Sequence, residues 1–172
     1  MFFEHPRKST EHGIEFSGGS LGQGLSLGAG TALGLKKKGN TAARVYVILG
    51  DGECDEGQVW EAAQSVTHFG LDNLTVIVDD NGLQFDGRKE EILKAGDPAA
   101  RWASLGFDVS RADGHDVEAL QAALERPADR PKVIIAKTVK GKGVHFAEND
   151  VTWHTGRLTD DLYEEAIRSI ND

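Results

Sequence analysis

Hydrophobic residues occur along the chain in two patterns, short continuous runs and positions at helical spacing, and the two patterns alternate. Runs rich in Val and Ile predict strands at residues 44–49, 73–78 and 132–138, and a shorter run predicts another at 107–110. The run at 44–49 is expected to be buried on both faces of a parallel sheet. Spaced apolar positions predict helices at residues 20–37, 59–69, 97–105, 116–126 and 159–170.

This alternation of strands and helices indicates an α/β fold, a parallel sheet with helices on both faces. The 172 residues are enough for one domain with a sizeable core, so residues 1–172 are interpreted as a single domain. Residues 1–19 are expected to form an irregular entry segment, and Ser20 is expected to cap the first helix. Residues 140–156 form a long polar loop, and such loops in compact domains are often functional.

Composition limits the classes of partner. A formal net charge of −9 argues against nucleic acid, because nucleic-acid-binding proteins carry basic surfaces. The sequence contains no apolar run as long as a membrane span, so we expect no membrane partner. The single cysteine, Cys54, excludes an internal disulfide and favours a reducing, cytoplasmic location.

Polar side chains follow the first two long predicted strands. The first strand runs into the sequence GDG, which contains Asp51, and the second runs into DDNG, which contains Asn81. A βαβ crossover takes roughly thirty residues, which is the separation of these two side chains. They can therefore meet at the carboxyl edge of the sheet, where open α/β folds bind their ligands.

The chemistry of these side chains favours a hard cation. Asp51 and Asn81 offer oxygen atoms, which suit Mg²⁺ or Ca²⁺ rather than zinc, and we expect the backbone carbonyl of Leu83 to add a third oxygen. Asp79 and Asp80 are rival ligands from the same turn.

The glycines beside Asp51 let the backbone approach a bulky anion, and the N–H of Gly52 is expected to point at it. Mg²⁺ is usually held by one or two carboxylates together with phosphate oxygens. The pattern therefore predicts a metal-bridged diphosphate site.

Several motifs together resemble one family. GDG with an asparagine at this distance resembles the thiamine diphosphate motif. GDGECDEG at 50–57, DDNG at 79–82, SLGQG at 20–24, DGHD at 113–116 and KGKGVHFAENDVTWH at 140–154 resemble the transketolase family, in that family's order. The resemblance covers nearly the whole chain. It implies a thiamine diphosphate-binding fold of the diphosphate-binding (PP) type, with thiamine diphosphate and Mg²⁺ or Ca²⁺ as cofactors.

The resemblance also implies roles for individual residues. His5 and His154 resemble catalytic histidines near the substrate, and His154 also approaches the diphosphate. The cofactor-binding set implied is Gly19, Leu21, Asp51, Gly52, Glu56, Asn81, Leu83 and His154, with Asp51, Asn81 and Leu83 at the metal.

The family resemblance further implies partners. The pyrimidine-binding domain and an N-terminal extension of the family have no counterpart in residues 1–172, so we expect a separate pyrimidine-binding subunit. The glycine-rich helix and the region of Glu56 and Glu61 are expected to mediate self-association. The implied reaction moves a two-carbon ketol unit from a ketose, usually phosphorylated, to an aldehyde acceptor. Alternatives are the α component of a 2-oxo acid dehydrogenase and a truncated paralogue that binds cofactor or partner without turnover.

Overall fold

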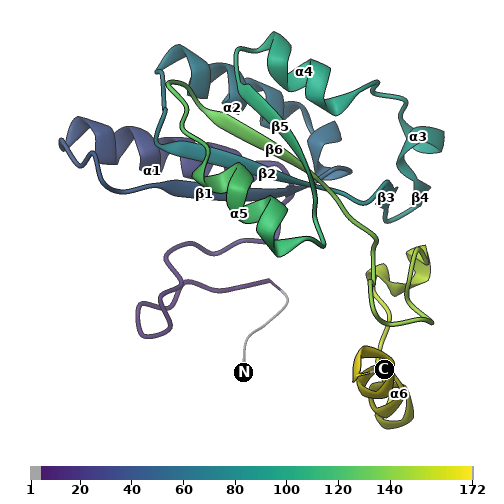
Figure 1. Ribbon diagram of the computed structural model, residues 1–172. Coiled ribbons are helices and arrows are strands. Elements are labelled where there is room, and N and C mark those ends of the chain that lie inside the picture. The colour runs from purple at the N-terminus through teal and green to yellow at the C-terminus, as the bar shows by residue number, and fades with distance from the viewer. Residues whose placement is uncertain (1–4, 172) are drawn as a thin grey trace.

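The computed structural model describes residues 5–171 and contains one parallel sheet of four strands, in the order β1-β2-β6-β5 (Figure 1). These strands are β1 (Val45–Gly50), β2 (Leu74–Asp80), β5 (Asp108–Asp113) and β6 (Lys132–Lys137). A short antiparallel pair, β3 (Leu83–Gln84) and β4 (Gly87–Arg88), follows β2. Because all four long strands are parallel, their carboxyl ends lie at one edge of the sheet.

Helices lie on both faces of this sheet, as the sequence predicts. In Figure 1, α5 lies on the near side of the sheet and α1 and α2 on the far side, and α5 packs against β5 and β6. The α-helices are α1 (Gln23–Lys37), α2 (Gly57–His68), α3 (Lys89–Ile92), α4 (Pro98–Ser104), α5 (Val117–Glu125) and α6 (Asp160–Asn171). Two 3₁₀ turns, η1 (Glu53–Asp55) and η2 (Val151–His154), complete the elements of the described chain.

Side-chain caps set the start of two helices. The carboxylate of Asp116 accepts hydrogen bonds from the N–H groups of Glu118 and Ala119, at 2.9 and 3.1 Å, so Asp116 caps α5. Asp97 caps α4 in the same way. Such caps satisfy N–H groups that have no partner within the helix.

The start of α1 differs from the prediction. We expected Ser20 to cap this helix, but α1 begins at Gln23 and its cap position is Gly22, which has no side chain to accept a bond. Gly22 has a φ of +79°, a conformation that suits glycine. Its N–H is satisfied instead by a distant carboxylate, that of Glu53.

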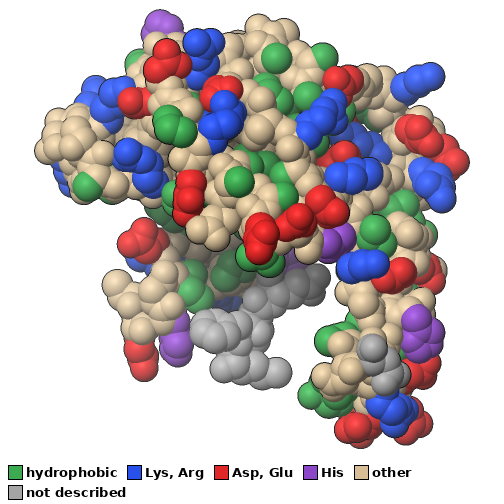
Figure 2. Space-filling model, viewed as in Figure 1, with side chains coloured by type: hydrophobic (Ala, Val, Ile, Leu, Met, Phe, Trp, Pro, Cys, Tyr) green, Lys and Arg blue, Asp and Glu red, His purple; other side chains and the backbone are tan. Residues whose placement is uncertain are grey.

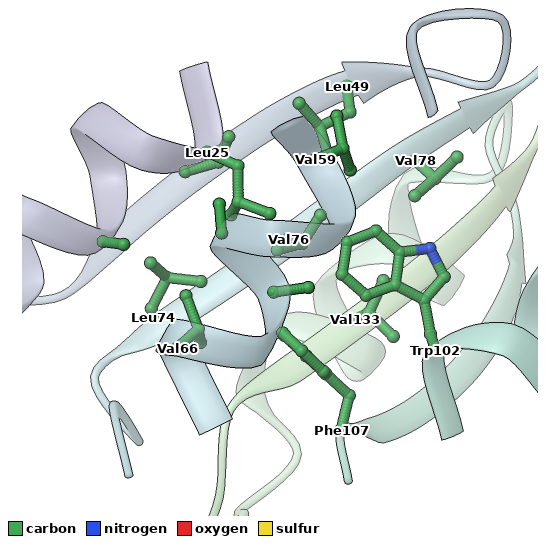
Figure 3. Close-up of a cluster of buried hydrophobic side chains, with 14 of the residues drawn as sticks. Leu25, Leu49, Val59, Val66, Leu74, Val76, Val78, Trp102, Phe107 and Val133 are labelled. Atoms are coloured by element: carbon green, nitrogen blue, oxygen red, sulfur yellow. The ribbon is translucent and has the colours of Figure 1, made fainter. Parts of the chain in front are cut away.

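The hydrophobic core lies between the sheet and the layer of α1, α2 and α4 (Figure 3). Trp102 of α4 is fully buried and its ring contacts those of Trp60 and Phe107, with centroids 5.0 and 4.9 Å apart. Leu25 of α1 and Leu49 of β1 are also fully buried in this layer. This core fixes the strands whose ends carry the predicted site.

The prediction that β1 is buried on both faces is wrong. Val47 and Leu49 point into the core, but Tyr46 and Ile48 on the opposite face are 54% and 72% exposed. The reason is topological. β1 is an edge strand, and α5 covers the opposite end of the sheet on that face.

The C-terminal helix lies apart from the sheet. Figure 1 shows α6 beside the long loop at 140–150, where the Ser169 hydroxyl donates to the carbonyl of Gly143 at 2.7 Å. In Figure 2, acidic side chains lie around this helix together with Lys, Arg and His, and a further row of acidic side chains lies near the centre of the view. No helix within residues 5–171 has the length and apolarity needed to cross a membrane.

Candidate functional site

Asp51 joins the ends of β1 and β2. Its side chain is 1% exposed, and its carboxylate accepts hydrogen bonds from two backbone N–H groups, those of Gly52 at 2.9 Å and Gly82 at 2.8 Å. Gly82 has a φ of +76°, so the turn after β2 favours glycine at this position. The two strand ends are thus connected through a buried charged group.

Gly52 does not act as the sequence predicted. Its N–H donates to the carboxylate of Asp51, rather than pointing outward to an anion. Its lack of a side chain nevertheless matters, because a Cβ at this position would lie 2.8 Å from Cβ of Gln84. Gly52 therefore allows the loop after β1 to pack directly against β3.

Asn81 lies in the turn between β2 and β3. Its amide nitrogen Nδ2 donates to the carboxylate of Asp79 at 3.0 Å, and its oxygen Oδ1 accepts from the N–H of Leu83 at 2.9 Å. Asn81 is half-buried and Leu83 is buried. The turn is therefore held by its own polar side chain.

Asp51, Asn81 and Leu83 line one cavity of about 580 Å³ at the carboxyl ends of the strands. Most of the remaining wall comes from α3 and the following loop, from the end of β6 and from Asn149 in the long loop. The structure thus brings the three predicted metal-site residues to one place. Its volume suits a small ligand or cofactor.

The electrostatics of this cavity centre on Asp51. Burial raises the pKa of this carboxyl above its ordinary value, although the bond from Gly82 and the charge of Lys89 oppose that rise. A buried carboxylate is costly unless it is paired or bound to a cation. Lys89 of α3 lines the same cavity and supplies a positive charge.

The two rival ligands differ in their surroundings. Both carboxylate oxygens of Asp79 are occupied, one by the amide of Asn81 and the other by the hydroxyl of Thr138. Asp80 lines the cavity, but its carboxylate lies 3.6 Å from the ammonium of Lys137. The side chain oriented by hydrogen bonds at the cavity wall is therefore Asn81.

The remaining predicted residues form a second group at the start of α1. The ring of His5 lies directly against Gly19, where a Cβ would approach the ring to 2.6 Å. Leu21 is exposed, and Glu56 packs beside Gly22. None of these four predicted residues, His5, Gly19, Leu21 and Glu56, lines the cavity at Asp51.

Glu53 connects the two groups. One carboxylate oxygen accepts from the N–H of Gly22 at 2.9 Å, and the other accepts from the N–H of Gly50 at 3.1 Å. The sequence alone assigned no role to Glu53. The bridging role of Glu53 depends on its long-range contact with Gly22. The only sequence feature related to this contact is the glycine-rich SLGQG motif, which contains Gly22.

His154 lies in η2 near the hairpin formed by β3 and β4. Its ring meets that of Phe85 edge to face, with centroids 5.4 Å apart, and its side chain is exposed. His154 is not part of the cavity wall at Asp51. It is held beside the turn that carries Asn81 and Leu83, because η2 packs against β3.

The donor atoms fit an oxygen-loving divalent cation. Within residues 5–171 there is no cluster of three or more His, Cys, Asp or Glu side chains arranged for a metal. A site built from Asp51, the Asn81 amide and a backbone carbonyl would leave the other positions of Mg²⁺ to water and phosphate, which is how proteins commonly bind this ion. The residues therefore fit a phosphate-bound Mg²⁺ and do not resemble a zinc centre.

A parallel sheet with an acid and an amide at adjacent strand ends, beside one cavity, is typical of the α/β domains that bind ligands at the carboxyl edge of the sheet. Comparison with known proteins identifies its family. Residues 3–170 match the family described as "Transketolase, thiamine diphosphate binding domain". The chain belongs to the transketolase family, as its motifs had indicated.

Two curated relatives and one solved structure show the extent of the similarity. The chain is 37% identical over 163 residues to an apulose-4-phosphate transketolase subunit of Phocaeicola vulgatus, covering 93% of this chain and 58% of that protein. It is 36% identical over 161 residues to the 6-deoxy-6-sulfo-D-fructose transketolase subunit of a Clostridium species, covering 92% of this chain and 58% of that protein.

The crystal structure of transketolase from Campylobacter jejuni superposes with a TM-score of 0.86 at 29% identity, over 92% of this chain and 26% of that one. The chain thus spans a little over half the length of the two relatives and about a quarter of that transketolase.

Proposed function

We propose that this chain is the diphosphate-binding part of a two-component, thiamine diphosphate-dependent transketolase. The observation that carries the proposal is the meeting of Asp51, Asn81 and Leu83 at one cavity on the carboxyl edge of the sheet. In this proposal the carboxylate of Asp51, Oδ1 of Asn81 and the carbonyl of Leu83 hold Mg²⁺ or Ca²⁺. The cation in turn holds the diphosphate of the cofactor, with Gly52 and His154 nearby.

The protein's own groups orient the reactants. When bound, thiamine diphosphate supplies the carbanion chemistry of ketol transfer, which amino-acid side chains do not provide. Gly19, Leu21 and Glu56 belong to the proposed cofactor-facing surface at the start of α1. His5 and His154 are exposed and are proposed to face the substrate, where an imidazole can donate a hydrogen bond or move a proton.

The proposed partner is a separate subunit that covers the pyrimidine end of the cofactor. Two observations support an assembly. The two curated relatives described above are themselves named as subunits. On the outer face of β1 the apolar side chains of Tyr46 and Ile48 are both exposed, and exposed apolar surface of this kind is a feature of interaction sites.

Self-association is proposed through the glycine-rich α1 and the Glu56 and Glu61 region. A methyl group at Gly30 or Gly34 would meet no atom within 4 Å, so this side of α1 is open to another backbone. Glu56, directly before the adjacent α2, and Glu61 within it are both exposed.

The proposed substrates are small sugars or sugar phosphates, with a ketose as donor and an aldehyde as acceptor. The named substrates of the two curated relatives, apulose 4-phosphate and a sulfonated deoxyfructose, support this class. A cytoplasmic location, with no nucleic-acid partner, remains a prediction from composition. The transketolase names of the relatives favour ketol transfer over the 2-oxo acid dehydrogenase alternative.

Reconstitution tests this function. The partner is first identified by co-purification with the tagged chain, and ketol transfer is measured for the chain, the partner and their mixture with thiamine diphosphate and Mg²⁺. We expect activity only in the mixture and its loss on addition of EDTA. Full activity of the chain alone would refute the two-component proposal, whereas tight cofactor binding without turnover in the mixture would favour a non-catalytic paralogue.

A further inference from the structure

The amide of Asn81 has one allowed orientation. It lies between a carboxylate oxygen of Asp79, which can only accept a hydrogen bond, and the N–H of Leu83, which can only donate one. If the amide turned over, its NH₂ group would face the N–H of Leu83 and its oxygen would face the carboxylate. Both contacts would then be repulsive, so Oδ1 is fixed on the side of Leu83.

Asp79 is itself held from the neighbouring strand. The hydroxyl of Thr138, directly after β6, donates to the second carboxylate oxygen of Asp79. The backbone N–H of Thr138 also donates to the carbonyl of Asp80, at 3.3 Å. Asp79 therefore connects the end of β6 with the turn that carries Asn81.

The DGHD turn holds this end of β6 in place. Gly114 packs against Thr138 so closely that a Cβ would lie 2.3 Å from the methyl group of Thr138. The N–H of Gly114 donates to the carbonyl of Lys137 at 2.7 Å, and the ring of His115 accepts from the N–H of Val139 at 2.7 Å. A chain of direct contacts thus runs from Gly114 through Thr138 and Asp79 to Asn81.

We propose that Asp79 is a positioning residue, which fixes the Asn81 amide so that its oxygen, and never its NH₂ group, is available to the cation. This inference rests on the proposed function, because it assumes that Asn81 is a ligand. Asp79 does not line the cavity, and both its oxygens are occupied by protein groups. Partners that orient metal ligands in this way typically contribute roughly 10–100-fold to metal affinity.

A simpler role for Asp79 would be electrostatic, since any nearby carboxylate attracts a cation. Two variants separate the roles. Asp79→Ala removes both the charge and the acceptor. Asp79→Asn removes only the charge, because its carbonyl can still accept from Asn81 while its NH₂ faces the hydroxyl of Thr138, which can also accept.

The experiment uses Mn²⁺ as the probe. The chain, together with its partner subunit where the two co-purify, is titrated with Mn²⁺ at saturating thiamine diphosphate, and free Mn²⁺ is measured by electron paramagnetic resonance. We expect Asp79→Ala to weaken Mn²⁺ binding by about tenfold or more and Asp79→Asn to keep most of the affinity. Equal losses in the two variants, or no loss in Asp79→Ala, would overturn the inference.

A second pair of variants, made in the Asn81→Asp protein, tests directly whether the orientation of the residue 81 side chain matters. In Asn81→Asp both side-chain atoms are oxygens, so orientation no longer matters, and Asp79→Ala is expected to cause no further loss there. An undiminished loss in this background would overturn the inference in favour of charge alone. Thermal unfolding of each variant, with Asp86→Ala as an exposed control in the next loop, detects any general damage to the fold.

The proposed function and the inference can fail separately. If the wild-type protein shows no Mn²⁺ binding that depends on thiamine diphosphate, the proposed site falls and the inference falls with it. If the wild-type protein binds Mn²⁺ and Asp51→Asn does not, while Asp79→Ala binds Mn²⁺ as well as wild type, the site assignment is supported and only the role proposed for Asp79 is wrong.

Discussion

The carboxylate of Asp51 and the backbone N–H of Gly82 are joined by a hydrogen bond of 2.8 Å, which ties the end of β1 to the turn after β2. The same carboxylate also accepts from Gly52. This buried group therefore shapes the turn that carries Asn81, as well as being a proposed cation ligand.

The first prediction separates these two roles of Asp51. Asp51→Ala would leave two N–H groups without an acceptor, at a cost of about 1–3 kcal/mol each where water cannot reach them. Asp51→Asn removes the charge and keeps one acceptor, but its NH₂ group must face one of the two N–H groups, so we expect a smaller loss of stability than in Asp51→Ala. We expect Asp51→Asn to stay folded and to lose Mg²⁺-dependent binding of thiamine diphosphate, by more than the roughly hundredfold typical of outer-shell changes.

Calorimetric titration with the cofactor, with and without Mg²⁺, measures this loss. Asp86→Asn is the matched control, because Asp86 is an exposed acid in the hairpin after the site. Equal cofactor affinity in wild type and Asp51→Asn would contradict the site assignment.

The second prediction concerns two glycines of α1. A Cβ at Gly28 would lie 2.4 Å from a methyl group of Val47, whereas one at Gly30 would meet nothing within 4 Å. We expect Gly28→Ala to destabilise the fold by about 1–3 kcal/mol, because α1 would have to move away from β1. Gly30→Ala should be neutral or stabilising by up to about 1 kcal/mol, because alanine favours helix.

Denaturant unfolding of both variants at one low protein concentration tests this pair. Comparable effects of the two substitutions would contradict this prediction. Two small effects would mean that α1 tolerates Gly28→Ala by shifting, and two large losses of stability would mean that Gly30 is also covered. Sedimentation of Gly30→Ala reports separately on the proposed self-association through this face of α1.

The sequence predicted most of the strands and the meeting point of Asp51 and Asn81, because both follow from local patterns. An apolar run identifies a strand, and the length of a βαβ crossover brings successive strand ends together. The open face of β1 was not predictable in this way. Tyr46 and Ile48 look like core residues in a continuous apolar run, and only the sheet order shows that β1 is an edge strand without a helix on that side.

Residue roles that depend on contacts between distant parts of the chain were also not predictable from the sequence. Asp79 appeared as a rival ligand, because nothing in DDNG indicates that Thr138 occupies one of its oxygens. The N–H of Gly52 was expected to face an anion, but the nearest acceptor is the carboxylate of its own neighbour, Asp51. Competition between local hydrogen-bond partners decides such details, and a motif alone does not reveal it.

The third prediction is that Cys54 is chemically inert in the folded chain. The side chain is 3% exposed, and burial, opposed by Lys89, raises the pKa of its thiol to about 12. The thiolate is the reactive form, so a raised pKa suppresses reaction. At pH 8 we expect a thiol reagent to label the folded protein slowly and the urea-unfolded protein fully, with Cys54→Ala as the blank.

The raised pKa of the Cys54 thiol also makes the stability of the fold depend on pH, in a definite direction. Because the folded pKa lies above the unfolded value of about 8.5, the protonated thiol contributes stability below that pH, and this contribution is lost as the pH rises toward 12. Rapid labelling of native protein at pH 8 would show that the loop around Cys54 opens readily.

The last prediction tests His154 as a catalytic group. Its side chain is exposed and its ring contact is with Phe85, so truncation should cost little stability. If His154 acts on the substrate, His154→Ala should lower turnover of the reconstituted enzyme by about a hundredfold, the usual scale for a general acid or base. His68→Ala is a matched control, because His68 is also exposed and also meets an aromatic ring, that of Phe69, but lies at the far end of α2. Steady-state kinetics and melting curves of the two variants test this prediction. Wild-type activity in His154→Ala would mean that His154 is only a surface residue. An equal loss of activity in His154→Ala and His68→Ala would point to a general effect of removing an exposed imidazole.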